Sequence, residues 1–87
     1  MPRGGARMDA LEPISLANAA SRFDRPYVTV RVWAHRYHAA KIGNIGRHAR
    51  YDYGDLALIE WFIRTGRPVP NSPAARAQAH ADHPART

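Results

Sequence analysis

The sequence contains no cysteine, which excludes disulfide bonds and thiolate metal sites. It also lacks an apolar run near the ~20 residues that a membrane-spanning helix requires, and no apolar stretch follows the charged N-terminus as a signal peptide would need. Lysine is almost missing, since Lys41 is the single lysine among 13 basic residues. We therefore expect one small cytoplasmic domain of the 87 residues, with no membrane contact.

Acidic residues are scarce in the middle of the chain. Between residues 22 and 51 there are seven basic residues and one acid, Asp24, whereas the regions on either side carry both signs equally. The net charge of +6 therefore belongs to this stretch. A local excess of this kind indicates a surface that binds a polyanion, although a solvated face of an arginine-rich protein has the same composition.

Hydrophobic spacing predicts two short helices in the first half of the chain. Ser15 suits the N-cap of a helix over 16–22, and Pro26 lies just beyond its expected end. A second helix is expected over 29–38, with Thr29 as its N-cap. Its core face is predicted to consist of Val30, Trp33, Ala34 and Tyr37. The opposite face then meets solvent or a ligand.

Glycine and aspartate divide the next segment into a hairpin and a third helix. Gly46-Arg47 suits the reversal between strands over 41–45 and 48–51. Asp52 suits the N-cap of the third helix, with Asp55 in the later position of a capping box. Gly66 is expected to end this helix.

Three segments follow from this pattern. We expect a flexible lead over 1–12, a folded domain over 13–67 and a disordered tail over 68–87. The tail is predicted to be disordered because no large apolar residue follows Asn71; a nascent helix over 74–81 is the alternative.

The order helix, turn, helix, basic hairpin, helix is that of a winged helix-turn-helix. The segment Val30-Arg31-Val32-Trp33-Ala34-His35-Arg36 resembles the second helix of MerR-type and phage excisionase-type winged helices. Gly46-Arg47, Arg50-Tyr51 and Asp55-Leu56 continue the resemblance at the spacing of that family's wing and third helix, and Leu16-Ala17-Asn18-Ala19-Ala20 is similar to its first helix.

This resemblance covers residues 14–63. It implies a mainly α fold with a small β-hairpin, in the winged helix-turn-helix arrangement. It also implies binding to double-stranded DNA, as an excisionase-like recombination directionality factor or a small MerR-like transcription regulator. The long dimerising helix and effector domain of full-length MerR regulators have no counterpart in these residues, so we expect no small-molecule effector.

The residues predicted to contact DNA combine the outward face of the second helix with the hairpin and the end of the first helix. We expect Arg31 to contact bases or phosphates from the major groove and Arg47 to contact the backbone from the hairpin tip. The predicted set is Arg22, Arg25, Thr29, Arg31, Val32, His35, Arg36, Lys41, Asn44, Arg47, His48 and Arg50. Besides DNA, a second copy of the chain or an integrase is an expected partner.

No residue pattern supports catalysis, a cofactor or a metal. The pairs His35/His38 and His80/His83 have a spacing found in zinc sites, but neither is completed by a cysteine or a nearby carboxylate. No serine–histidine–aspartate set or pair of catalytic acids is indicated by spacing. We therefore expect a binding protein that is not an enzyme.

The third predicted helix has more apolar residues than a small core needs, which indicates a second candidate function. Leu56, Ile59 and Phe62 suffice for a small core, which leaves Leu58, Trp61 and Ile63 partly on another side. They predict a protein-binding adaptor that docks a partner through this helix, unless residues 11–14 fold across them. RNA binding through the basic stretch is a further alternative and would require exposed aromatic residues.

Overall fold

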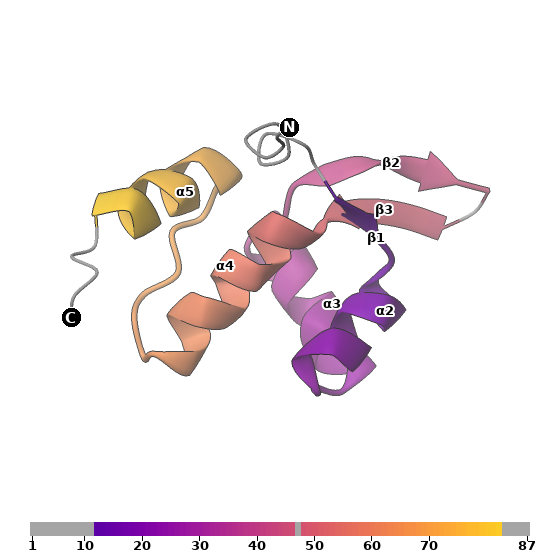
Figure 1. Cartoon of the computed structure of the whole chain (residues 1–87), viewed down its shortest axis with the longest axis horizontal. Coiled ribbons are helices and arrows are strands. Elements are labelled where there is room, and N and C mark those ends of the chain that lie inside the picture. The colour runs from indigo at the N-terminus through magenta and orange to yellow at the C-terminus, as the bar shows by residue number, and fades with distance from the viewer. Residues whose placement is uncertain (1–11, 47, 83–87) are drawn as a thin grey trace, which may run out of the picture.

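The computed structural model describes residues 12–46 and 48–82. In these ranges it contains four helices and a three-stranded antiparallel sheet with the strand order β1-β3-β2 (Figure 1). The elements are β1 (Pro13–Ile14), α2 (Leu16–Phe23), α3 (Tyr27–Arg36), β2 (Lys41–Ile45), β3 (His48–Asp52), α4 (Tyr53–Arg64) and α5 (Pro73–Asp82). The predicted mainly helical fold with a small hairpin is confirmed at this level.

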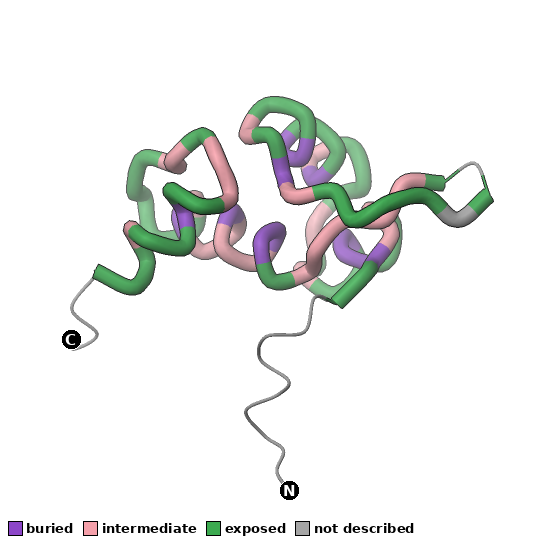
Figure 2. The backbone as a smooth tube through the Cα atoms, turned by 90° about the horizontal axis from the view of Figure 1, so that it is seen from above, coloured by how far each residue is buried: buried purple, intermediate pink, exposed green. Residues whose placement is uncertain are grey.

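The hairpin and α5 lie at opposite ends of the molecule. Figure 1 shows β2 and β3 projecting from one end, with α2, α3 and α4 in the middle and α5 beyond α4. Seen from above, the buried segments belong mostly to the helices, whereas β2 is exposed and β3 is mostly partly buried (Figure 2). None of the helices in the described ranges is long and apolar enough to cross a membrane.

The core forms where α2, α3 and α4 meet the sheet. Val30, Trp33 and Ala34 of α3 are buried as predicted, whereas Tyr37 is only partly buried. The remaining buried apolar residues are Ile14, Ala19, Ala20, Ala39, Leu56, Ile59 and Phe62. Because β1 pairs Ile14 with Tyr51 on β3, the N-terminal segment completes the sheet instead of covering α4.

The second helix begins earlier than the sequence predicts. Its N-cap is Pro26, and Thr29 lies inside α3 with its backbone N–H donating to the Pro26 carbonyl at 3.1 Å. The prediction of Thr29 as the cap is therefore wrong. The φ of −60° at Pro26 already suits the start of a helix, while its ψ of 144° keeps the residue extended.

Helices α2, α3 and α4 end in the same hydrogen-bonded turn. In each, a residue with positive φ follows the helix: Asp24 at 58°, His38 at 55° and Gly66 at 74°. The next residue donates its N–H five positions back, as Ala39 does to Ala34 at 3.0 Å. Gly66 confirms its predicted role, whereas Asp24 and His38 adopt without glycine a conformation that glycine reaches at lower cost.

Asp52 connects the sheet to α4 and caps that helix as predicted. Its carboxylate accepts the N–H groups of Gly54 and Glu12, each at 3.3 Å. The capping-box role predicted for Asp55 is wrong, because this side chain is buried and is bound to Ala40 and to α5.

Replacing the cap should lower the stability of the domain. We expect Asp52→Ala to reduce the free energy of unfolding by about 1 kcal/mol, because two backbone N–H groups lose their acceptor. In a domain of this size, that corresponds to a fall in Tm of about 4–8 °C, measurable by thermal denaturation followed by circular dichroism. Asp52→Asn keeps an acceptor and should restore most of the loss; equal Tm values for Asp52→Ala and the unsubstituted protein would contradict the capping role.

The C-terminal segment departs most from the sequence expectation. Residues 68–82 form a connection and then α5, which packs on α4, so the helix over 74–81 that was the alternative to disorder agrees with the structure. The buried residue of α5 is Arg76, whose side chain is fully inaccessible to solvent. A pattern of apolar residues cannot reveal a helix that is anchored by an arginine. The predicted lead over 1–12, apart from Glu12, and the last five tail residues lie outside the described residues.

Candidate nucleic-acid interface

The outward face of α3 is exposed and carries no acidic residue. Arg31, Val32, His35 and Arg36 are all exposed, as predicted, on the side opposite the buried Val30 and Ala34. At 100° per residue, Val28, Val32 and His35 lie near the middle of this face, with Arg31 on one flank and Arg36 on the other. Thr29 is only half-buried and lies toward the edge of the face.

A groove connects the start of α3 to the hairpin. It measures about 430 Å³ and is lined by Ser15, Leu16, Ala17, Tyr27, His48, Ala49 and Tyr51. Because Arg31 follows Tyr27 by four residues, it lies one turn further along the same side of α3. Arg31 does not line the groove itself but lies on the same side of α3 as Tyr27, which does.

The predicted hairpin residues lie on two faces. Lys41 pairs with Tyr51 and Asn44 pairs with Ala49, so both share the face of β3 that borders the groove. Arg50 lies between Ala49 and Tyr51 in β3 and therefore points to the opposite face. The ladder is irregular between Lys41 and Gly43, which bends the outer strand at Ile42. Arg47 lies outside the described residues.

Arg22 and Arg25 are engaged within the protein. Arg22 donates to the Glu12 carboxylate at 2.8 Å and lies over the Tyr53 ring at 4.7 Å. This hydrogen bond and the charge of Glu12 raise the pKa of Arg22 above its ordinary value. Arg25 lies 3.6 Å from Glu60 and over the ring of Trp33. Arg22 and Arg25 were both predicted to contact DNA. In the fold they bind other residues of the protein and lie apart from the outward face of α3.

Positive charge remains uncompensated on α3 and the hairpin. Within the described ranges, Arg31, Arg36, Lys41 and Arg50 form no ion pair. Three of the acids pair with other arginines: Glu12 with Arg22, Glu60 with Arg25 and Arg64, and Asp55 with Arg76. Two of the cations without an ion pair therefore lie on α3 and two on the hairpin.

A buried arginine fixes the end of α3 relative to α4 and α5. The Arg76 guanidinium binds Asp55 with two nitrogens, Nε to Oδ1 at 2.7 Å and Nη2 to Oδ2 at 2.5 Å. Its remaining donors bind the carbonyl oxygens of Tyr37 (2.7 Å), Pro70 (2.8 Å) and His38 (3.3 Å). All five N–H donors of a guanidinium therefore have acceptors here.

The same network reaches the start of the hairpin. The second carboxylate oxygen of Asp55 also accepts the backbone N–H of Ala40 at 2.7 Å, one residue before β2 begins. The side chains of His38 and Asn71 approach to 3.2 Å across the same junction. The orientation of β2–β3 relative to α3 thus depends on Asp55 and Arg76. Sequence reasoning missed both residues, because an arginine in an alanine-rich polar segment has the composition of solvated surface.

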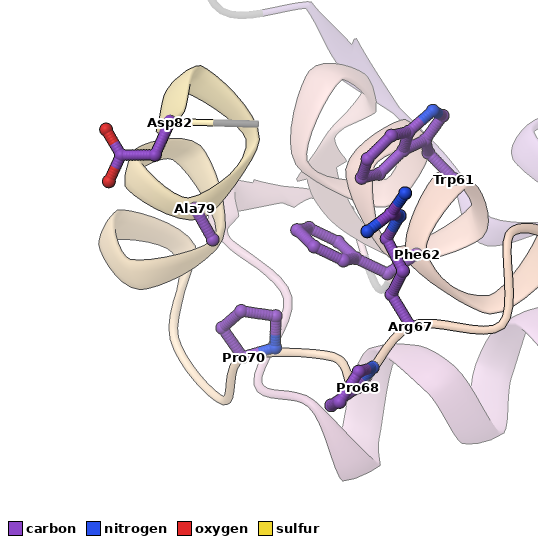
Figure 3. Close-up of a pocket in the computed structure, with 7 residues that line it drawn as sticks. All are labelled: Trp61, Phe62, Arg67, Pro68, Pro70, Ala79 and Asp82. Carbon is purple, nitrogen blue, oxygen red and sulfur yellow. The ribbon is translucent and has the colours of Figure 1, made fainter. Parts of the chain in front are cut away.

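A second hollow lies at the other end of the molecule, between α4 and α5. It measures about 500 Å³, and Figure 3 shows Trp61, Phe62, Arg67, Pro68, Pro70, Ala79 and Asp82 around it. The Arg67 guanidinium lies 5.4 Å from the centre of the Trp61 ring, and the rings of Phe62 and of His80 on α5 lie edge-on to that ring with centroids 4.9 and 4.8 Å away. This helix therefore covers part of the surplus apolar surface of α4 that the sequence left for a partner.

The described part of the chain contains no group of three or more histidine and acidic side chains that could hold a metal ion. Comparison of the chain with known protein families, curated proteins and solved structures finds no match. Functional arguments for this protein therefore depend on its own residues and geometry.

Proposed function

We propose that this protein binds double-stranded DNA sequence-specifically, with α3 in the major groove and the β2–β3 hairpin as a wing against the backbone. In this arrangement the fold is a winged helix-turn-helix of the MerR-like and excisionase-like kind. Its cellular role is that of a recombination directionality factor or a small transcription regulator. Such a protein acts by occupying and bending its site, and it needs no catalytic residue.

The uncompensated charge of α3 and the hairpin carries this proposal. Four described cations without an ion pair lie on α3 and the hairpin, and Glu12, Glu60 and Asp55 bind arginines elsewhere in the fold. A helix of about 10–12 Å diameter fits the major groove of about 12 Å, which lets the outward side chains of α3 reach base edges. Lys41 and Asn44, on the groove face of the hairpin, are then placed to contact the adjacent backbone.

The adaptor alternative receives less support from the same geometry. An adaptor would dock its partner on the apolar residues of α4 that the core does not need. Helix α5 covers part of that surface, where His80 of α5 contacts Trp61 of α4. The outward face of α3 remains exposed in comparison. We therefore propose DNA binding ahead of protein docking.

Binding should depend steeply on salt. If Arg31, Arg36, Lys41, Arg47 and Arg50 each neutralise one phosphate, the logarithm of the association constant should fall against the logarithm of salt concentration with a slope of about −4.5. Fluorescence anisotropy with duplexes selected from a random pool measures this slope. The selected duplex should bind at least about 1,000-fold more tightly than a scrambled one.

Matched competitors separate this proposal from its alternatives. Single-stranded DNA and double-stranded RNA of the same sequence should compete no better than scrambled duplex, because neither presents the major-groove pattern of B-form DNA. Equal affinity for every duplex, or no salt-sensitive binding to any, would refute sequence-specific DNA recognition. Preferential binding to RNA would show that the basic surface of α3 and the hairpin binds RNA instead of DNA.

A further inference from the structure

Two exposed valines occupy the middle of the outward face of α3. Val28 is 56% exposed and Val32 is 49% exposed, among the most exposed large apolar side chains of the described residues. They lie four residues apart and therefore on the same face of the helix. Cations flank them, with Arg31 on one side and Arg36 on the other, and His35 lies beside them.

Solvent exposure alone does not account for valine at these positions. Valine is β-branched, and in a helix it loses side-chain freedom that alanine, lysine or glutamine keeps. On a face that only met water, each of the two would weaken the helix and expose apolar surface without compensation. The combination of an apolar centre with cationic flanks instead indicates a ligand that has an apolar floor and anionic walls.

The major groove of DNA offers that combination. Its walls are phosphates, and the only apolar group on its floor is the C5-methyl of thymine. Val28 and Val32 are separated by about 6 Å along the helix axis, close to two base-pair steps of about 3.4 Å each. A protein partner would instead need an apolar centre with an acidic rim; the apolar hollow between α4 and α5 has one acid, Asp82, and is also lined by the cation Arg67 (Figure 3).

We infer that Val28 and Val32 are specificity-determining residues that contact thymine methyl groups, so that the preferred site carries thymines at two positions under α3. This inference rests on the proposed DNA binding and adds the identity of the bases that the apolar part of the face selects. Arg31 then reads a base beside them, for which guanine is the match to an arginine fork.

Removing the thymine methyl tests the inference directly. A duplex selected from a random pool is prepared again with deoxyuridine in place of each thymine in turn, and affinities are measured by fluorescence anisotropy. Uracil pairs as thymine does and lacks only the methyl group. We expect about fourfold weaker binding at one or two positions, the change that corresponds to one methyl group withdrawn from an apolar contact, and no change elsewhere.

Valine variants assign the positions. Val32→Ala should bind the thymine duplex about fourfold more weakly and should lose the difference between thymine and uracil at one position, and Val28→Ala should do so at the other. Val32→Ile keeps a branched apolar side chain and should retain the preference. The ratio of thymine to uracil affinity is insensitive to a general loss of stability, so a merely structural effect leaves it unchanged.

Three outcomes overturn the inference. They are equal affinity for thymine and uracil at every position, a selected site without thymine, and valine-to-alanine variants that keep the full ratio. If Val28→Ala and Val32→Ala abolish self-association measured by analytical ultracentrifugation while the ratio stays at one, the pair contacts protein and the inference also fails. Sequence-specific binding in any of these cases leaves the proposed function standing, whereas the absence of binding to any duplex rejects that function itself.

Discussion

Arg76→Ala should unfold a large fraction of this protein at 37 °C. The substitution leaves the Asp55 carboxylate buried at 5% exposure without its cation, and removes the donors to the Tyr37, His38 and Pro70 carbonyls. Breaking a buried ion pair from one side costs about 3–5 kcal/mol. The free energy of unfolding of a domain this small lies near the low end of about 5–15 kcal/mol, so about 2 kcal/mol or less would remain. Urea denaturation followed by tryptophan fluorescence measures the loss.

An exposed ion pair provides the control. Arg64 binds Glu60 at 3.0 Å, but its side chain is 57% exposed, so Arg64→Ala should cost less than about 1 kcal/mol. Arg76→Lys keeps the charge but not the planar fork and should recover only part of the loss. A midpoint for Arg76→Ala within error of that for Arg64→Ala would show that Arg76 does not hold α5 in place.

Arg31→Gln should have the largest effect on the affinity for DNA of any single substitution on α3. This residue is exposed and lies one turn from the groove that joins α3 to the hairpin. Loss of a two-pronged contact to a base costs about 1–3 kcal/mol, or about 5–150-fold in affinity. The preference for the selected duplex over a scrambled one should shrink by the same factor, as measured in parallel titrations. Arg50→Gln, on the other face of the hairpin, should weaken both duplexes alike.

Net charge must be held equal for that comparison. Ala74→Glu lowers the charge by one, as Arg31→Gln does, but places the change in the first turn of α5, where a carboxylate favours the helix. It should leave the affinity for the selected duplex within about twofold, because α5 is not part of the surface proposed to contact DNA and charges that make no direct contact are screened by salt. Equal losses from both variants would mean that only the total charge matters and that Arg31 makes no specific contact.

Local chemistry explains which features could be predicted from the sequence. Ser15 accepts the N–H of Asn18 at 3.1 Å, Asp52 caps α4 and Gly66 ends it, each as expected from a single residue type at a helix end. The hairpin was predictable from Gly46, which has φ of 63° at the turn. The predicted exposure of Arg31, Val32, His35 and Arg36 is confirmed because α3 has one apolar face and the burial of that face fixes the other.

Long-range pairing explains what could not be predicted. Asp55 matched a capping box because its spacing from Asp52 was right, yet its partners are Ala40 and Arg76, far away in the sequence. The charges of Arg22 and Arg25 were counted as available, although Glu12 and Glu60 bind them in the folded state. A charge pattern gives the number of cations in a region, but only the fold shows which of them are neutralised.

The separation of Asp55 from Arg76 also has a consequence during synthesis. The two residues are 21 positions apart, so at about 5–20 residues per second a ribosome adds Arg76 about one to four seconds after Asp55. A chain whose synthesis stops in this interval keeps Asp55 but lacks the cation that pairs with its buried carboxylate. Such a chain should unfold more readily and be cleaved faster by proteases than the chain that includes α5, because the ion pair between Asp55 and Arg76 cannot form.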